Sequence, residues 1–435
     1  MARQRSCIMP NSVSNAPQNT PDIAIVGAGI IGVACALQLA RQGLRVVLLD
    51  QQPPGLGASF GNAGHMATEQ VFPIADLSIL MRLPAMLMDP MGPLRLDWKY
   101  LPRALPWFAR LLLNLRPAPF QRSVAGIRAL NESSLGAWQR LLASIDRAAL
   151  FKHQGSLLVF ERGESRRAID ALQARMGQQA VALDYWSAEA VREAAPQLSE
   201  QIKGGLFFPA TGHFLDPYQV VGELMAAAQA LGTAFIQRRV LGGWLHERGV
   251  SLLTDQGPVE ARRVLIACGA HSAQLTAALT GKQVPLDTER GYHLMLPHEP
   301  QRLPFPVTSL ERKFIMTPMS GGLRLAGTVE FAGLERPANM ARAWQLHQLS
   351  KGLFRQNLNL DDATPWMGFR PSLPDSLPVI DQAADGRVLL AFGHQHLGLT
   401  QAAVTAELVG RLAMPTALSA SGPLPDLQPY RLDRF

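Results

Sequence analysis

The sequence predicts an α/β protein with a Rossmann-like dinucleotide-binding domain and a second, α+β domain built on a mainly antiparallel sheet. The chain has 435 residues, of which 47% are hydrophobic and 17% are charged. A chain of that length is longer than one hydrophobic core usually organises, so two domains are expected. That composition excludes an intrinsically disordered protein. Two patterns predict the two domains. The first is a glycine-rich turn between an apolar strand and a helix, and the second is a set of strand-like segments farther along the chain.

The chain begins with a segment that we expect to be a flexible leader, residues 1–20, whose only charges are Arg3 and Arg5. No apolar block of signal-peptide length precedes Pro21, so secretion is not expected. Residues 23–37 are apolar, but they are too few for a membrane span and include three glycines. A buried strand followed by a helix explains this stretch better.

The first predicted strand and helix carry a glycine pattern, Gly27-Ala-Gly29-Ile-Ile-Gly32. Gly27 allows a tight turn, Gly29 lets the backbone approach a pyrophosphate, and Gly32 lets the helix pack on the strand. The N-terminus of the helix offers free N–H groups and a partial positive charge to phosphates. The alternative is a glycine-rich turn that binds nothing.

The second predicted strand, Arg45 to Asp50, ends in an acid that lies 21 residues after Gly29. This offset is typical of the acidic residue that accepts hydrogen bonds from the ribose hydroxyls and disfavours a 2′-phosphate. FAD and NAD share the whole pattern, so it predicts a dinucleotide without choosing between them.

The next segment contains a string of small and hydrogen-bonding side chains, Ser59-Phe-Gly-Asn62-Ala63-Gly64-His65. Together with the glycine pattern, this string resembles the amine- and amino-acid-oxidising flavoproteins of the D-amino acid oxidase (DAO) family. It is most similar to the bacterial D-amino acid dehydrogenases, whose equivalent loop carries a Ser-Phe-x-Asn-Ala-Gly string. The resemblance extends over about residues 22–415 and implies FAD as the cofactor.

The same resemblance implies which residues contact the cofactor. Most come from the glycine turn, the loop after the second strand, a middle strand at 261–268 and a C-terminal strand and turn at 387–400. The implied cofactor-binding residues are Gly27, Gly29, Ile30, Ile31, Gly32, Asp50, Gln51, Ser59, Asn62, Ala63, Gly64, Val240, Cys268, Gly269, Gly393, His396, Leu397, Gly398, Leu399 and Thr400. A helix predicted from Gln401 to Leu412 would point its N-terminus at the flavin, where its dipole favours negative charge.

We therefore expect a discontinuous FAD-binding domain of residues 21–75, 213–283 and 362–415. Residues 76–212 and 284–361 would form the substrate-binding domain, and residues 416–435 a C-terminal tail. Strand-like segments at 155–160, 205–208 and 292–296 favour a largely antiparallel sheet in the second domain.

Residues 71–120 are rich in proline and methionine and carry more basic than acidic side chains. Residues 107–113 have the pattern of a short basic amphipathic helix. One interpretation is a helix of the substrate domain whose apolar face is core. The other is a surface that docks on a membrane or a partner subunit. We favour the first because no continuous basic cluster supports the second.

A second specific string is Gly368-Phe-Arg370-Pro, followed shortly by Pro378-Val-Ile. In the family, the arginine at this point binds the substrate carboxylate. Arginine suits this role because its planar fork gives two parallel hydrogen bonds and stays charged at working pH. The alternative is a surface arginine beside a rigid proline turn.

Three further residues are candidates for the catalytic site. Tyr292 matches a family strand that faces the substrate, although a tyrosine in a strand is often only packed. His394 lies beside the flavin by resemblance, where we expect a hydrogen-bonding wall rather than a base. His65 replaces a usually small residue, which leaves flavin contact, substrate contact and covalent flavin attachment open. We find no buried carboxylate–histidine pair in the sequence, and the histidine spacing predicts no metal site.

Net charge and cysteine content limit the possible partners. The net charge of +7 is compatible with nucleic acid, an anionic membrane or acidic substrates. No basic block with interleaved aromatics is present, so nucleic acid is not expected. Three scattered cysteines, Cys7, Cys35 and Cys268, exclude an iron–sulfur cluster held by this chain alone and fit a cytoplasmic protein. Electrons would then leave through an iron–sulfur or second flavoprotein subunit, or through a quinone at the inner face of the cell membrane.

The resemblance thus predicts an FAD-dependent D-amino acid dehydrogenase that transfers hydride from Cα to flavin N5. Arg370 would hold the substrate carboxylate, and the amine would be neutral. The string at 393–402 is most similar to catalytic subunits of bacterial D-hydroxyproline dehydrogenases, so cis-4-hydroxy-D-proline or another D-proline-type substrate is preferred. The alternatives are a glycine or sarcosine oxidase that uses oxygen, a hydrogen-cyanide-forming glycine dehydrogenase subunit and, from another class, a tRNA-modifying flavoprotein.

Overall fold

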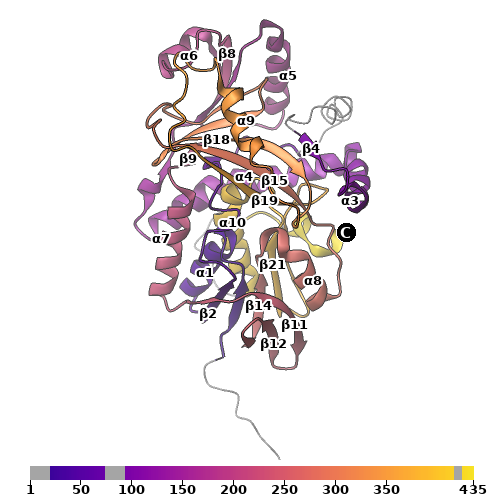
Figure 1. The fold of residues 1–435 in the computed structure, drawn as a ribbon. Helices are drawn as coiled ribbons and strands as arrows, with labels where there is room; N and C mark the ends of the chain where they lie inside the picture. The colour runs from indigo at the N-terminus through magenta and orange to yellow at the C-terminus, as the bar shows by residue number, and fades with distance from the viewer. Residues whose placement is uncertain (1–19, 74–93, 416–423) are drawn as a thin grey trace, which may run out of the picture.

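A computed structural model describes residues 20–73, 94–415 and 424–435 (Figure 1). Its central element is a six-stranded sheet in the order β10-β2-β1-β14-β21-β20. The strands come from four distant parts of the chain: β1 (Ile23–Val26), β2 (Val46–Asp50), β10 (Ala234–Gln237), β14 (Arg263–Ile266), β20 (Val379–Ala383) and β21 (Val388–Phe392). All neighbours pair in parallel except β20, which runs antiparallel to β21.

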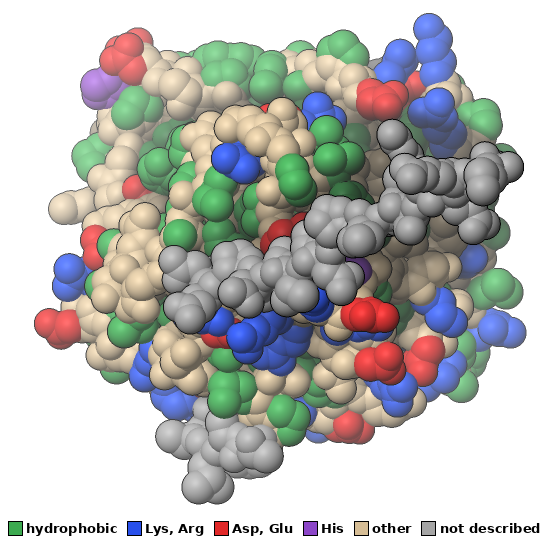
Figure 2. All heavy atoms as spheres, turned by 90° about the horizontal axis from the view of Figure 1, so that it is seen from below, with side chains coloured by type: hydrophobic (Ala, Val, Ile, Leu, Met, Phe, Trp, Pro, Cys, Tyr) green, Lys and Arg blue, Asp and Glu red, His purple; other side chains and the backbone are tan. Residues whose placement is uncertain are grey.

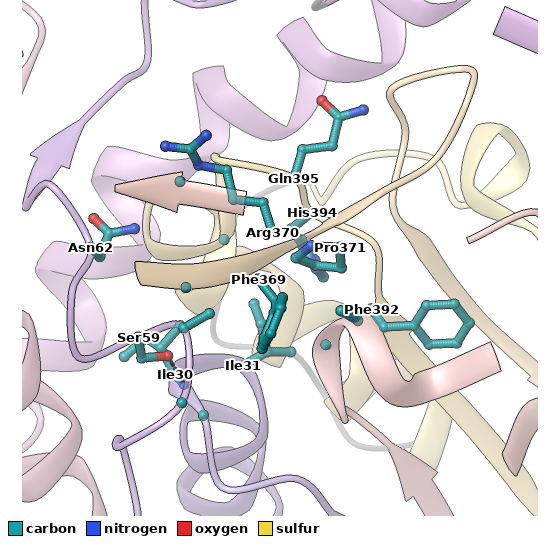
Figure 3. A pocket seen from close by; sticks show the side chains of 18 of the residues that line it. Ile30, Ile31, Ser59, Asn62, Phe369, Arg370, Pro371, Phe392, His394 and Gln395 are labelled. Carbon is teal, nitrogen blue, oxygen red and sulfur yellow. Dashed lines mark hydrogen bonds between the residues drawn. The ribbon is translucent and has the colours of Figure 1, made fainter. Parts of the chain in front are cut away.

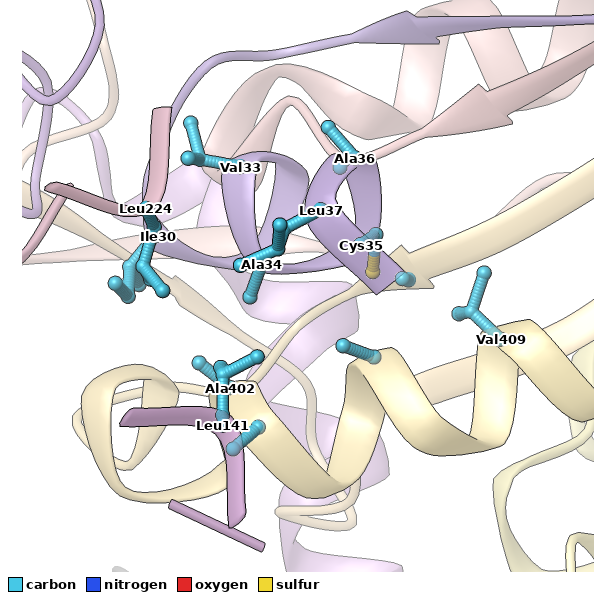
Figure 4. Close-up of a cluster of buried hydrophobic side chains, with 14 of the residues drawn as sticks. Ile30, Val33, Ala34, Cys35, Ala36, Leu37, Leu141, Leu224, Ala402 and Val409 are labelled. Carbon is cyan, nitrogen blue, oxygen red and sulfur yellow. The ribbon is translucent and has the colours of Figure 1, made fainter. Parts of the chain in front are cut away.

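This sheet is covered on both faces, as its continuous apolar strands require. Alternate residues of β1 enter different cores: Ile23 and Ile25 face one core, and Ala24 and Val26 face the other. The first core is formed by four helices, whose packed side chains are seen in Figure 4: α1 (Ile30–Arg41), α4 (Pro117–Ala143), α7 (Pro217–Ala230) and α10 (Gly398–Ala413). The second lies under α8 (Ser272–Thr280) and a small antiparallel sheet of β11 (Val240–His246), β12 (Gly249–Thr254) and β13 (Gly257–Ala261).

A larger sheet lies above the six-stranded one in the view of Figure 1. Its order is β19-β15-β18-β17-β16-β6-β8-β7, with β4 also paired to β18. Its strands are β4 (Leu94–Leu96), β6 (Ser156–Phe160), β7 (Asp184–Ser187), β8 (Gly204–Phe208), β15 (Asp287–Leu296), β16 (Val307–Ser309), β17 (Phe314–Met319), β18 (Gly322–Phe331) and β19 (Thr364–Ser372). The pairing is antiparallel except between β16 and β6 and between β18 and β4.

Smaller elements join these two layers. A three-stranded sheet contains β3 (His65–Met66), β5 (Phe151–Lys152) and β9 (Gly212–Phe214). The remaining helices are α3 (Leu101–Asn114), α5 (Arg166–Gly177), α6 (Ala188–Ala194) and α9 (Ala341–Ser350), with 3-10 turns at Ala148–Leu150, Gly163–Ser165, Gly269–His271, Gln428–Tyr430 and Leu432–Arg434. Within the described ranges, no helix has the length and apolar character that crossing a membrane requires.

The predicted fold class is confirmed, and most predicted elements have close counterparts. The segments at 155–160, 205–208 and 292–296 correspond to β6, β8 and part of β15 in the antiparallel sheet. The helix predicted from Gln401 is α10, which begins at Gly398. The domain division remains our proposal, with one change: β19 pairs with β15 in the large sheet, so residues 364–372 go with the second domain. Only residues 373–378 then connect β19 to β20 of the six-stranded sheet.

The predicted amphipathic helix at 107–113 is part of α3. Trp107 is buried, its ring centroid lies 5.3 Å from that of Phe331, and its indole N–H donates to the Ser372 carbonyl at 3.2 Å. This side of the helix is core, whereas Leu105 and other leucines of α3 are exposed. Residues 74–93 of the same predicted region lie outside the described residues.

Candidate active site

A cavity of about 1210 Å³ lies where the carboxyl ends of β1 and β2 meet the large sheet. Open parallel sheets bind their ligands at this edge. Its walls come from the α1 turn, the loop at 56–65, strands β15 and β19, and the turn at 393–399. Figure 3 shows Ile30 and Ser59 from the first part of the chain on one side of the cavity and Arg370 from β19 on the other.

The glycine turn has the close packing that its sequence predicts. Gly27 has a φ of +108°, and a Cβ there would lie 2.3 Å from the carbonyl oxygen of Ala267, the residue that follows β14. A Cβ on Gly32 would lie 1.8 Å from the Gly27 carbonyl oxygen. The backbone N–H of Ile30, in the first turn of α1, donates to the Ser59 hydroxyl at 2.9 Å and borders the cavity. The missing Cβ atoms let strand, turn and helix pack closely enough to bring the first turn of α1 to the cavity, as a dinucleotide-binding turn requires.

Asp50 borders the same cavity at the end of β2. One carboxylate oxygen accepts the Ala28 backbone N–H at 2.7 Å, and the other accepts that of Gln52 at 3.0 Å. These bonds fix the carboxylate beside the glycine turn. Because each carboxylate oxygen has a second acceptor position, Asp50 retains capacity for ribose hydroxyls. This carboxylate acceptor therefore fits the ribose in the adenosine half of a dinucleotide.

Sixteen of the twenty predicted cofactor-binding residues border the cavity. The other four, Gly32, Gly64, Leu397 and Thr400, support its walls instead. Thr400, for example, accepts the Ala67 backbone N–H at 3.0 Å through its hydroxyl. The Cys268 thiol donates to the Val26 carbonyl at 3.2 Å, and burial raises its pKa to about 12. It is a packed wall residue without thiolate character at neutral pH.

Arg370 lies over the middle of strand β15. A Cβ on Gly291 would lie 2.2 Å from an Arg370 guanidinium nitrogen, so the group rests on the bare backbone of this glycine. Its Nη1 donates to the Thr328 carbonyl on β18 at 3.2 Å. β18 bulges at this point, and Thr328 has a φ of +62°, an uncommon conformation for a β-branched residue. The guanidinium is thus held in the cavity wall by backbone groups.

Glu289 is a cavity residue that the sequence analysis missed. It pairs directly with Arg370 across β15 and β19, is 1% exposed and accepts the Ser372 hydroxyl at 2.5 Å. Burial raises the pKa of this carboxyl group, while Arg370 acts in the opposite direction. One sequence feature could have identified Glu289 as a candidate: it is an acid in a strand-like segment, two residues before Gly291 and so on the same face of the strand.

Tyr292 borders the cavity, but its hydroxyl group is engaged by the protein. It donates to a Glu330 carboxylate oxygen at 2.5 Å and accepts the Asn339 backbone N–H at 3.2 Å. Because side chains alternate along a strand, Tyr292 and Glu289 leave β15 on opposite faces. We therefore leave Tyr292 out of the proposed catalytic set.

The predicted histidines lie in the cavity wall and are hydrogen-bonded there. His394 contacts the Thr405 hydroxyl at 3.0 Å, and His396 contacts the Gln70 side-chain oxygen at 2.6 Å. Burial lowers their pKa values to about 3 and about 4, so both rings are neutral at neutral pH. Neutral rings agree with the expected hydrogen-bonding wall.

His65 is part of a buried carboxylate–histidine pair, which corrects the sequence interpretation that no such pair exists. Its Nε2 lies 3.0 Å from a Glu69 carboxylate oxygen, and its Nδ1 lies 3.2 Å from the Gly212 carbonyl oxygen. Both ring nitrogens are engaged by the protein, so neither is free for a substrate. The pair was missed because residues 65–69 do not read as a helix, the setting in which an i,i+4 contact is expected.

Comparisons with known proteins indicate the same cofactor as the cavity residues do. The model of the DAO family, described as FAD dependent oxidoreductase, matches residues 22–412. A D-amino-acid oxidase of Bradyrhizobium diazoefficiens is 34% identical, covering 95% of this chain and 98% of the relative. A D-amino acid dehydrogenase of Rhizobium johnstonii is 30% identical, covering 90% and 95%. The fold resembles that of glycine oxidase from Geobacillus kaustophilus, with a TM-score of 0.71, 21% identity, and 95% and 99% of the two chains covered.

The glycine turn generates a first prediction. Gly27→Ala should lower the flavin-to-protein ratio of the purified protein, because the new Cβ would displace backbone at the phosphate-binding turn. Gly43→Ala is the matched control: Gly43 also has a positive φ, +83°, but a Cβ there meets nothing within 4 Å. Gly43→Ala should cost about 1–2 kcal/mol of stability from backbone strain. Gly27→Ala should cost more because of the added clash with backbone, and only Gly27→Ala should lose flavin from its folded fraction. Equal flavin content in the two variants would contradict this assignment.

Proposed function

The chain belongs to the DAO family of FAD-dependent oxidoreductases, and from this premise we propose that it oxidises a D-amino acid to the imino acid. The observation that carries the proposal is the position of Arg370. Its guanidinium lies in the wall of the cavity that also contains the FAD-binding turn, and it has one hydrogen bond, to Thr328, among the described residues. The remaining N–H donors are suited to a carboxylate.

In this proposal the protein contributes binding and orientation. The glycine turn and Asp50 would hold FAD, which when bound supplies a two-electron acceptor for hydride from the substrate carbon. Arg370 binds the substrate carboxylate and thereby fixes the position of Cα. His394 and His396 stay neutral, so they close the cavity without adding positive charge. The N-terminus of α10, at Gly398, borders the cavity and favours negative charge nearby.

Two finer parts of the proposal rest on different support. A D-proline-type substrate, with cis-4-hydroxy-D-proline preferred, rests on the string from Gly393 to Ala402. A non-oxygen electron acceptor rests on relatives that are named D-amino acid dehydrogenases. The relative named D-amino-acid oxidase and the fold of glycine oxidase favour oxygen instead, so an amine oxidase remains the second candidate.

A tRNA substrate has less support. On the face shown in Figure 2, acidic side chains lie among the basic ones, whereas RNA binding favours a continuous basic surface.

The substrate anchor can be tested by substitution. Arg370→Ala should lower kcat/KM for D-amino acids by about 10²- to 10⁴-fold, because two hydrogen bonds to a charged group are lost. Arg370→Lys should recover only part of this loss, since lysine lacks the planar fork. Flavin content should stay unchanged in both variants. Normal turnover by Arg370→Ala would rule out the assignment.

Gly291 should matter through Arg370. In Gly291→Ala the methyl group would occupy the position of the guanidinium, so we expect KM for the amino acid to rise by about 10- to 100-fold. Flavin content should be retained, because Gly291 lies on the large sheet. An unchanged KM would show that the guanidinium does not bind substrate from this position.

The substrate and acceptor are tested by one screen of the purified protein, with and without co-encoded subunits. D-proline, both hydroxyproline epimers, D-alanine, glycine and sarcosine are offered with an artificial dye and then with oxygen. We expect the highest kcat/KM for D-proline-type substrates with the dye. Faster turnover of glycine or sarcosine with oxygen would instead identify the amine oxidase.

A further inference from the structure

Two side chains of opposite charge face the cavity from paired positions on β15 and β19. Glu289 and Arg370 are direct neighbours in the antiparallel register, so their side chains leave the sheet on the same face. Both border the cavity. An acid beside a substrate-carboxylate anchor repels that carboxylate and weakens its binding. Glu289 is therefore expected to have a function of its own in the site.

Each of these groups is positioned by a neighbour other than its partner. Glu289 accepts the Ser372 hydroxyl, and Arg370 donates to the Thr328 carbonyl. Each group lies within the electrostatic influence of the other, but among the described residues their hydrogen bonds go to Thr328 and Ser372 and not to one another. The cavity wall therefore presents a separate cation and a separate anion, side by side.

An α-amino acid carries a matching pair of charges, a carboxylate and an ammonium group on one carbon. We propose that Glu289 binds the amino group of the substrate while Arg370 binds its carboxylate, and that Glu289 accepts one amine proton. This inference rests on the proposed function and deepens it. It assigns recognition of the amine to a specific side chain and makes a zwitterionic amino acid the class of substrate that the wall fits.

The proton transfer is simple to balance. One N–H bond of the ammonium group breaks, and the proton passes to a Glu289 carboxylate oxygen. The nitrogen keeps the electron pair of that bond and becomes a neutral amine, and the carboxylate becomes a neutral carboxylic acid. The step requires no oxidant or reductant. A neutral amine can then donate its electron pair to Cα as hydride leaves.

The surroundings of Glu289 favour this role. Burial raises the pKa of its carboxyl group, the Ser372 hydrogen bond and Arg370 lower it, and Asp287 raises it, with a raised pKa as the net result. Asp287 is itself bonded to the Tyr100 hydroxyl at 2.7 Å. A carboxylate with a raised pKa is a stronger base for an ammonium group than a solvated one. Since the ionised form is the active one, kcat/KM should fall as the pH is lowered through this raised pKa.

The test uses two ligands, one with an amine and one without. Neither ligand has a hydrogen on a Cα that carries an amine, so neither can be oxidised by the proposed reaction. The first is α-methyl-D-proline, which has a carboxylate and an amine but no hydrogen on Cα. The second is (R)-tetrahydrofuran-2-carboxylate, in which oxygen replaces the amine. Their dissociation constants are measured by calorimetry on the FAD-loaded protein and on its Glu289→Gln variant. Glu330→Gln is the matched control, because Glu330 is also a buried acid of this sheet but bonds Tyr292 on the opposite face.

We expect Glu289→Gln to weaken binding of α-methyl-D-proline by about 10- to 100-fold, the effect of losing one hydrogen bond between charged groups. Binding of the tetrahydrofuran ligand should be unchanged or tighter, because a negative charge beside Arg370 is removed. Glu330→Gln should leave the ratio of the two constants as in the wild type. The pH profile of turnover should also change: in Glu289→Gln, kcat/KM should follow the titration of the substrate ammonium group itself.

Equal weakening of both ligands in Glu289→Gln would overturn the inference, because Glu289 would then only maintain the shape of the site. An unchanged preference for the amine ligand would overturn it as well. If Glu289→Gln does not fold, Glu289→Asp serves instead, and it should weaken the amine ligand more than the tetrahydrofuran ligand. Failure of the proposed function is distinct, since the wild-type protein would then neither bind α-methyl-D-proline nor oxidise any D-amino acid.

Discussion

The close contact between α1, β1 and β14 is the constraint on which the rest of the site depends. Gly27 and Gly32 leave no room for a Cβ, so the N-terminus of α1 lies directly at the edge of the parallel sheet. Asp50 and Ser59 are then bonded to the backbone of this same turn. Strands from four distant segments must assemble before that edge exists. The cofactor site is therefore a product of the whole sheet and not of one local motif.

The dinucleotide-binding half of the molecule was readable from the sequence because its signals are local. The spacing of Gly27, Gly29 and Asp50 fixes a turn, a helix start and a strand end within about thirty residues, as in other βαβ units. The substrate half depends on pairing between strands that are far apart. The sequence around Glu289 or Arg370 does not indicate that the two residues are paired, because their pairing depends on the register of β15 and β19. For the same reason, the face on which Tyr292 lies could not be predicted.

Charged side chains line the cavity on both sheets. Asp50 lies at the sheet edge, where a ribose would bind, whereas Glu289 and Arg370 lie on the large sheet. Burial lowers the pKa values of His394 and His396 in the cavity wall to about 3 and about 4, so these two rings stay neutral. On the β15–β19 strand pair a charged substrate therefore meets one basic and one acidic side chain, while Arg238, Arg239 and Lys313 also line the cavity.

The short connection from β19 to β20 has a mechanical consequence. Arg370 lies on the strand that leads, through residues 373–378, directly into β20 of the six-stranded sheet. The Trp107 indole N–H also binds the carbonyl of Ser372 at the end of this strand. Residues 281–286 join α8 to the start of β15 at the same place, where Asp287 pairs with Ser372. Two short links thus tie this end of the β15–β19 pair to the part of the molecule that carries the cofactor edge, so few residues of chain determine the distance between Arg370 and that edge.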